Sequence, residues 1–321
     1  MTKFAYCDIS NRIRQYDMAT PGLLPVPIYQ SIMNNVARLA VTSDNGFVLC
    51  GGATSTGHNE IHKVTRLPNQ QMSEDLIYVH TDPISAVRVR AGADNGEDRI
   101  YFSAGTDYKD GTPLRYDIYY LKSDAGSYVP VHYTTIFQAD LPCLDPCNGL
   151  YDSYLYTGDF VFGDNDTLYV SNGRFVGAQL GIFKIEGAGP DSVNGGPPQR
   201  IHEGPGPIEA LCYESPQTLY FLRRSPKSSD IWKVDINANT ETLVGNIPVS
   251  DEWAFDLAEI GNDMTQSAGW WVIPSSLHKW LVAAAHAMVR VAEALQVEKP
   301  IPHPDPRRAA SAQPLNKSAG E

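Results

Sequence analysis

The sequence lacks any apolar run that reaches the roughly 18 residues a membrane-spanning helix needs. It is also poor in positive charge, because 25 Lys and Arg stand against 37 Asp and Glu and give a net charge of -12. Such an acidic surface repels phosphate backbones and anionic lipids. We therefore expect neither a nucleic acid nor a membrane as a partner.

Cysteines are few and odd in number, and no apolar leader precedes the first patterned segment. These features are typical of a reducing compartment, so we expect a cytoplasmic protein. Cys7, Cys50 and Cys212 fall in strand-like runs and are expected to be small core residues. Cys143 and Cys147 lie in the loop-like stretch "CLDPC". A disulfide or a share in a metal site are the alternatives there to two plain loop thiols.

Signatures of several enzyme classes are also missing. The chain contains no HExxH, no pair of CxxC motifs, no P-loop and no GxSxG. It therefore offers no zinc-protease, nucleotide-binding or serine-hydrolase motif. No complete set of metal ligands is visible, and we expect neither a metal nor another cofactor.

What the chain does contain is a repeated pattern. Residues 156–173, "YTGDFVFGDNDTLYVSNG", comprise a strand, a tight polar turn and a second strand. Looser copies occur at residues 37–52, 85–105 and 209–223, and a third and a fourth alternating strand follow each copy. Four strands in a unit of about 45 residues are the signature of a β-propeller blade.

The two ends of this pattern complement each other. Residues 4–31 supply a second, third and fourth strand without a first, and residues 252–260 supply a lone first strand. Pairing them would close the ring and remove its exposed edges. We therefore predict an all-β propeller of five four-stranded blades over residues 1–260. A sixth blade within residues 137–156 or near residues 268–275 is the alternative.

Residues 261–298 are predicted to form an arm and an amphipathic helix. Ser275 or Ser276 can cap the helix after Pro274. Its apolar stripe recurs at intervals of three and four residues and consists of Leu277, Leu281, Ala284, Met288, Val291 and Leu295. We expect the helix to pack on the chain's own propeller, with self-association as the alternative. Residues 299–321 lack apolar periodicity and are expected to be disordered.

The phrase "GDFVFGDNDTLYVSNG" and, more loosely, the other blades resemble NHL, SMP-30/gluconolactonase and strictosidine-synthase-like propellers over residues 4–260. Membership of the SMP-30 lactonases would imply a divalent metal held by Glu and Asn residues in fixed motifs, which this sequence lacks. Five blades also resemble furanosidase-type glycoside hydrolases, whose acidic motif near the N-terminus is not evident here. Fungal propellers recruited as hetero-Diels–Alderases are similar in architecture only. The resemblance therefore implies a fold and leaves the activity open.

Long connections are predicted to gather at one end of the ring. They are residues 51–60, 104–115, 171–180 and 137–156, whereas the turns at the opposite end are mostly short. Long loops on one face of a rigid scaffold are where binding and catalytic sites are usually built. We therefore expect the site at the loop-rich mouth of the central channel.

Alignment of the five innermost strands brings several polar residues toward this mouth. Asp159 and Glu209 are the candidates for acid–base catalysis. The candidates for substrate binding are Asn35, Arg38, Ser85, Tyr156 and Trp253. The alternative is that these charged residues only pair across a wet channel. The mouth positions differ from blade to blade, which favours one asymmetric pocket over five repeated sites.

The leading hypothesis is a propeller that binds a small organic metabolite and acts on it as a metal-independent isomerase, cyclase or lyase. Such chemistry needs a shaped pocket and one or two polar groups. A glycoside hydrolase is the first alternative, and it would need two carboxyl groups about 5 to 10 Å apart. A propeller that only binds a ligand or serves as a scaffold is the second.

Overall fold

The computed structural model describes residues 3–260 with several gaps. The gaps are residues 9, 21–22, 53–58, 70, 95, 110–111, 125, 138–158, 172–179, 190–195, 197, 205–207, 215, 225–227 and 249–255. The chain divides into two compact units, Met1–Ala268 and Gly269–Glu321. The predicted helix and tail, and also Cys143 and Cys147, lie outside the described residues, so these predictions stay untested.

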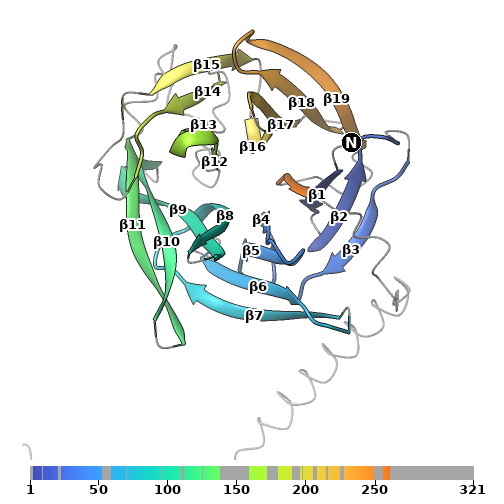
Figure 1. The fold of residues 1–321 in the computed structure, drawn as a ribbon, viewed down its shortest axis with the longest axis vertical. Coiled ribbons are helices and arrows are strands. Elements are labelled where there is room, and N and C mark those ends of the chain that lie inside the picture. Colours follow the sequence, from blue (N-terminus) through green and yellow to red (C-terminus); the bar gives the residue numbers. More distant parts are fainter. Residues whose placement is uncertain are drawn as a thin grey trace, which may run out of the picture. The chain divides into compact units, whose positions relative to one another are not determined.

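Five antiparallel sheets of four strands each surround a central axis (Figure 1). Blade 1 consists of β20 (Ala258–Ile260), β1 (Lys3–Cys7), β2 (Arg12–Asp17) and β3 (Val26–Gln30). Blade 2 consists of β4 (Arg38–Val41), β5 (Phe47–Gly51), β6 (Glu60–Arg66) and β7 (Met72–Val79). Blade 3 consists of β8 (Ile84–Asp94), β9 (Glu97–Lys109), β10 (Thr112–Asp124) and β11 (Ser127–Phe137).

The last two blades follow the same order from the axis outward. Blade 4 consists of β12 (Phe160–Phe162), β13 (Leu168–Ser171), β14 (Leu180–Ile185) and β15 (Gln199–Gly204). Blade 5 consists of β16 (Ile208–Glu214), β17 (Thr218–Arg224), β18 (Ser228–Asp235) and β19 (Thr240–Pro248). The prediction of an all-β propeller with five blades is confirmed.

Blade 1 is built from both ends of the propeller sequence. β1 pairs with β20 in an antiparallel register that places Lys3 opposite Ile260 and Ala5 opposite Ala258. This is the predicted closure, in which the lone first strand at one end completes the three strands at the other. It stabilises the ring because β20 covers the edge of β1 that would otherwise be unpaired.

The apolar sequence of the inner strands follows from burial on both faces. Along β5, Phe47 and Leu49 pack in the core shared with blade 1, while Val48 and Cys50 pack in the core shared with blade 3. Successive side chains of a strand point to opposite faces, so a strand between two neighbours must be apolar throughout. Burial raises the pKa of the Cys50 thiol to about 12, as expected for a small core residue.

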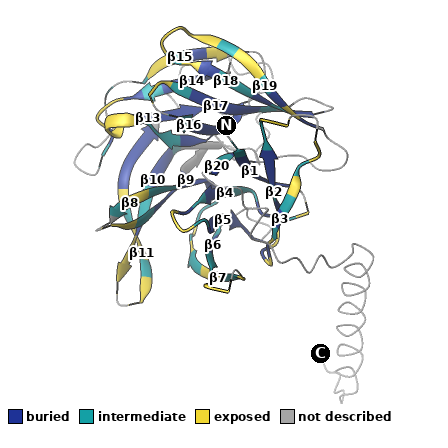
Figure 2. Ribbon diagram, turned by 45° about the vertical axis from the view of Figure 1, so that its right-hand side comes forward, coloured by how far each residue is buried: buried dark blue, intermediate teal, exposed yellow. Residues whose placement is uncertain are grey.

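Blade 3 has the longest strands of the ring. Its four strands have 11, 13, 13 and 11 residues. At one end of the channel β9 and β10 continue through residues 104–109 and 112–115, so most of the long connection predicted there is strand. At the other end, where the innermost strands finish, the β10–β11 hairpin is largely exposed (Figure 2). Blade 3 therefore forms a raised wall at this end of the channel.

Candidate functional site

Arg88 lies at the centre of the ring and contacts the other four blades. Its side chain extends from β8, and Nε donates to the carbonyl oxygen of Phe160 on β12 at 2.9 Å. The two terminal nitrogens donate to the carbonyl oxygens of Leu39 on β4 and Leu211 on β16, each at 3.2 Å. Three innermost strands are thus tied to a fourth by one planar guanidinium group.

Two carboxylates complete this central cluster. Arg88 forms an ion pair with Asp159, which precedes β12, and bonds both carboxylate oxygens of Asp256 at 3.2 Å. Asp256 precedes β20 and so brings in blade 1. The side chain of Arg88 is 8% exposed and both carboxylates are 0% exposed. Charges at this depth are tolerated only when they are paired and hydrogen-bonded, as these are.

Asp159 and Asp256 make the same set of backbone contacts. Each accepts the N–H of the residue that follows it, at 2.8 Å in both cases. Each also accepts an N–H from the innermost strand of the next blade, Leu211 at 2.7 Å for Asp159 and Leu39 at 2.9 Å for Asp256. The two carboxylates therefore join neighbouring blades at two points of the ring.

These contacts bear on the two roles considered for Asp159. Its Oδ2 atom binds Arg88 and the Leu211 N–H of other blades, and its Oδ1 atom accepts the Phe160 N–H. These contacts favour pairing across the channel over acid–base chemistry. Its partner is Arg88, which the strand alignment did not single out. A signal for Arg88 exists in "SAVRVRAG", where a cation interrupts a strand that must be buried on both faces. A role of Asp159 in proton transfer stays a prediction.

The structure brings two other candidates together. Arg38, at the start of β4, donates through Nε to the carbonyl oxygen of Ser85 at 2.7 Å. The hydroxyl group of Ser85 lies 2.7 Å from that of Ser103 on β9. Glu209 is 6% exposed and lies on β16 where the pairing with β17 shifts register. Irregularities of this kind redirect side chains and are common beside functional sites.

The remaining candidates give less information. Asn35 is exposed and has a left-handed backbone with φ 51°. Tyr156 and Trp253 lie outside the described residues, as do parts of the long connections. The loop-rich mouth predicted from the sequence is therefore described only in part.

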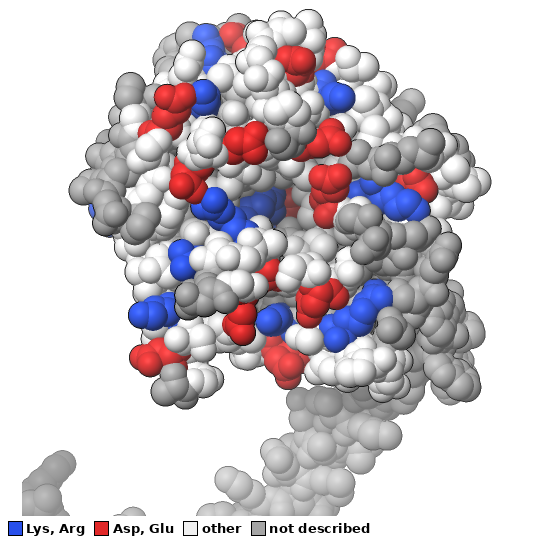
Figure 3. Space-filling model, viewed as in Figure 1, with Lys and Arg blue, Asp and Glu red and all other residues white. Residues whose placement is uncertain are grey.

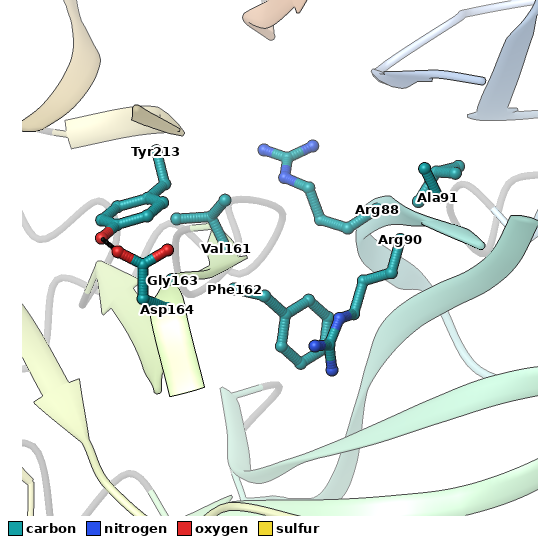
Figure 4. A pocket seen from close by; sticks show the side chains of 9 residues that line it. Arg88, Arg90, Ala91, Val161, Phe162, Gly163, Asp164 and Tyr213 are labelled. Carbon is teal, nitrogen blue, oxygen red and sulfur yellow. Dashed lines mark hydrogen bonds between the residues drawn. The ribbon is translucent and has the colours of Figure 1, made fainter. Parts of the chain in front are cut away.

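A pocket lies at the other end of the channel, where the innermost strands of blades 3, 4 and 5 finish. Its volume is about 340 Å³, within the range of small-molecule sites. It is lined by Arg88, Val89, Arg90, Ala91, Val161, Phe162, Gly163, Asp164 and Tyr213 (Figure 4). The sequence did not point to this end, because its turns are short.

Arg90 and Phe162 form one side of the pocket. The guanidinium carbon of Arg90 lies 4.9 Å from the centre of the Phe162 ring (Figure 4). The group also pairs with Asp166 at 2.7 Å. Burial disfavours the charge of Arg90, but the hydrogen bond and the charge of Asp166 outweigh it and raise its pKa. A cation on the face of an aromatic ring is held by the ring quadrupole as well as by its counter-ion.

Tyr213 forms the opposite side. Its hydroxyl group donates to Asp164 at 2.7 Å, and its ring stacks on Tyr169 with centroids 5.5 Å apart. Burial and the hydrogen bond to Asp164 raise the pKa of Tyr213 to about 12. Gly163 lies beneath these rings, and a Cβ atom there would come within 2.5 Å of the Tyr169 ring. Only glycine fits at this close approach.

A short turn joins the two sides. Asp164–Asp166 form a 3-10 turn in which Asn165 and Asp166 have left-handed backbones, with φ of 55° and 58°. Asn and Asp tolerate this region better than other residues with a Cβ atom. The turn directs Asp164 to blade 5 and Asp166 to blade 3, so one segment of blade 4 contacts both walls of the pocket.

Charge of both signs surrounds this end of the ring. Figure 3 shows Lys and Arg side chains interspersed with Asp and Glu around a central hollow, without a field of one sign. Among the described residues, no group of three or more His, Cys, Asp or Glu is placed to hold a metal ion. In the same part of the chain, no helix is long and apolar enough to cross a membrane.

No family model and no curated protein matches the chain. Similar solved structures include a nidogen/laminin complex, with 9% identity, a TM-score of 0.46 and coverage of 81% of this chain and 98% of that one. A periplasmic gluconolactonase from Pseudomonas aeruginosa has 10% identity, a TM-score of 0.44 and coverage of 78% and 83%. Two structures of an exo-β-1,3-galactanase from Phanerochaete chrysosporium have 10% identity, TM-scores of 0.41 and 0.42, and coverage of 66% of this chain and 50% of that one. These likenesses concern the propeller fold alone.

Proposed function

We propose that this propeller binds a small, uncharged organic molecule in the pocket where β8, β12 and β16 end. One observation carries the proposal: the arginines of the pocket already have partners within the chain. Arg88 is paired with Asp159 and Asp256, and Arg90 is paired with Asp166.

A charged ligand would meet a cost that a neutral one avoids. It would have to displace Asp166 from Arg90, or remain without a counter-ion in a partly desolvated site. A neutral molecule can instead place an apolar face on Val161 and Phe162 and form hydrogen bonds at the margins of the existing pairs. A few polar groups in a mostly apolar lining are typical of small-molecule sites.

The test uses three probes that share one ring and differ in charge. They are 4-hydroxybenzyl alcohol, 4-hydroxybenzoate and tyramine, and binding is measured by ligand-observed NMR. The neutral alcohol is expected to bind with a Kd on the order of 1 mM, as suits so small a ligand. The two charged probes are expected to bind more weakly. A wild-type protein that binds either charged probe better than the alcohol would overturn the proposal.

A pair of substitutions locates the binding. Val161→Phe enlarges a side chain of the pocket near the end of β12 and should abolish the signal of the neutral probe. Val41→Phe makes the same change near the end of β4, outside the pocket, and should leave the signal unchanged. Similar losses in both variants would show that the probe binds elsewhere.

A second candidate function is the metal-independent isomerase, cyclase or lyase with Glu209 as its acid or base. The supporting observation is a carboxylate that is 6% exposed and lies at a register shift on an innermost strand. The glycoside-hydrolase alternative needs a second acid beside Glu209, and the contacts of Asp159 with Arg88 make Asp159 a poor choice.

Metabolite and 4-nitrophenyl glycoside panels, analysed by mass spectrometry, test this candidate. Glu209→Gln keeps the size of the side chain, so a catalytic role predicts about 10²-fold less product with little change in the thermal midpoint. Equal product from wild type and variant, or a lowered midpoint without any product, would reject it.

A further inference from the structure

We propose that the Arg90–Asp166 ion pair determines which charge the pocket accepts. With both residues present the pocket favours neutral ligands, in keeping with the proposed function on which this inference rests. Loss of Asp166 would make it a site for organic carboxylates, and loss of Arg90 would make it a site for organic ammonium ions. We call the Arg90–Asp166 pair the charge filter of the pocket.

Arg90 is held in place without Asp166. Its guanidinium group stacks on the Phe162 ring at 4.9 Å, and its backbone is paired with Arg99 in the β8–β9 ladder. Removing the Asp166 carboxylate would leave a stacked cation beside the pocket with donors to offer. Guanidinium groups bind carboxylates through two parallel hydrogen bonds, so a carboxylate ligand could take the vacated position.

Asp166 is equally held in place without Arg90. The turn that carries it is anchored by the Tyr213–Asp164 hydrogen bond at 2.7 Å and by the Gly163 N–H, which donates to the carbonyl oxygen of Thr167 at 2.8 Å. The left-handed backbone of Asp166 keeps the carboxylate directed toward blade 3. Removing Arg90 would leave an acceptor at the margin of the pocket.

The pair itself adds little to the stability of the fold. Arg90 is 32% exposed and Asp166 is 61% exposed, so water screens their attraction. Exposed pairs of this kind contribute little to stability in most proteins. Variants of either residue should therefore remain folded, which allows their ligand preferences to be compared.

The two gains should be unequal. Asp164 lines the pocket, and Glu214 and Glu259 lie at the same end of the innermost strands. Partial burial and, to a smaller extent, the neighbouring Glu214 raise the pKa of Glu259, so these two carboxylates lie within electrostatic reach of each other. In a variant without Arg90, these acids would attract an ammonium ligand. In a variant without Asp166, the same acids would repel a carboxylate ligand.

The experiment measures 4-hydroxybenzoate and tyramine against two variants at low ionic strength. Arg90→Gln should bind tyramine up to about fivefold more tightly than wild type does, and Asp166→Asn should bind 4-hydroxybenzoate about twofold more tightly. The double variant carries neither charge and should lose both gains. A variant that shows no gain for its own probe would overturn the inference.

A second ion pair of similar exposure serves as the control. Arg200 and Glu203 on β15 lie 3.3 Å apart and are 30% and 37% exposed, away from the pocket. Arg200→Gln and Glu203→Gln change the net charge by the same amounts and should leave both affinities as in wild type. Equal gains in these variants would attribute the effect to net charge and overturn the inference. A further outcome is that the wild-type protein fails to bind the neutral probe while the Arg90 and Asp166 variants bind their charged probes more tightly. That result would reject the proposed function but support the role of the ion pair.

Discussion

Arg88 and Arg90 lie two residues apart on β8, but their guanidinium groups make different kinds of contact. Arg88 is 8% exposed and reaches the axis, where it binds groups from the other four blades. Arg90 is 32% exposed, stacks on Phe162 (Figure 4) and pairs with one exposed carboxylate, that of Asp166. Depth along one strand therefore decides whether an arginine holds the ring together or forms a single ion pair near the surface.

The physical difference is the cost of an unpaired charge at each depth. A buried carboxylate that loses its cation cannot be rehydrated, whereas an exposed one is rehydrated at once. Substitutions around Arg88 should therefore change the free energy of unfolding. Substitutions around Arg90 should change which ligands bind.

The largest expected effect is that of Arg88→Met. It would leave Asp159 and Asp256 charged and buried without their cation, and should lower the free energy of unfolding by about 3–5 kcal/mol or prevent folding. Arg90→Met should lower it by about 0–1 kcal/mol. Urea unfolding of both variants measures the difference. Arg88→Lys keeps the charge but not the planar set of donors, and should fall between them. Equal losses at the two positions would contradict the comparison.

The carboxylate partners should follow the same order. Asp159→Asn keeps the size of a 0%-exposed side chain but removes its charge beside Arg88, and should cost about 2–4 kcal/mol of stability. Asp166→Asn removes an exposed charge and should cost about 0–1 kcal/mol. Thermal and urea unfolding provide the measurement. A stable Asp159→Asn protein that had lost a catalytic activity would instead support the acid–base role predicted from the sequence.

A smaller effect is expected at Gly163, under the turn that carries Asp166. In Gly163→Ala the new methyl group would press on the Tyr169 ring and should cost about 1–3 kcal/mol. Gly189→Ala is the control, because the nearest atom to a Cβ there is 3.9 Å away. Thermal unfolding compares the two. Equal thermal midpoints of the two variants would mean that the Tyr169 ring moves aside. The turn would then be less tightly packed than its contacts indicate.

The smallest effect concerns the acidic end of the channel, and its sign depends on pH. Burial first, and Glu214 second, raise the pKa of Glu259. A raised carboxyl pKa means that ionisation is less favourable in the folded state, so this residue destabilises the fold increasingly as pH rises through its unfolded and folded pKa values. Glu259→Gln should therefore raise the thermal midpoint at about pH 7 but not at about pH 3. A larger gain at the lower pH would contradict this sign.

The fold could be predicted because its signals are local. The pattern of strand, polar turn and strand occurs within residues 156–173. The burial of both faces of β5 follows from five consecutive residues that carry no charged or polar side chain. The closure of blade 1 needed one further step, the matching of an incomplete set of strands at one end with a lone strand at the other. Both inferences use only neighbours along the chain and the rule that edges are paired.

The candidate site could be predicted only in part, because it depends on distant residues. Asp159 was singled out from its place before an innermost strand, but its partner Arg88 lies in mid-strand and in another blade. The pocket arises where three strands of unequal length end together, and the reach of β8 beyond Arg90 is not visible in a repeat pattern. The sequence prediction relied on the residues where the innermost strands start and on the length of the loops there. It therefore favoured the end of the channel opposite to the pocket.

The pairing of β1 with β20 has a consequence for how the chain folds during synthesis. Lys3 and Ile260 are partners, so β1 is synthesised long before the strand with which it pairs. Contacts of such long range are slow to form, and until then β1 exposes an unpaired edge that can join another nascent chain. The same closure brings Asp256 to Arg88, so the axial cluster gains its second carboxylate only as the ring closes. A chain released before residue 256 would therefore lack both β20 and that carboxylate.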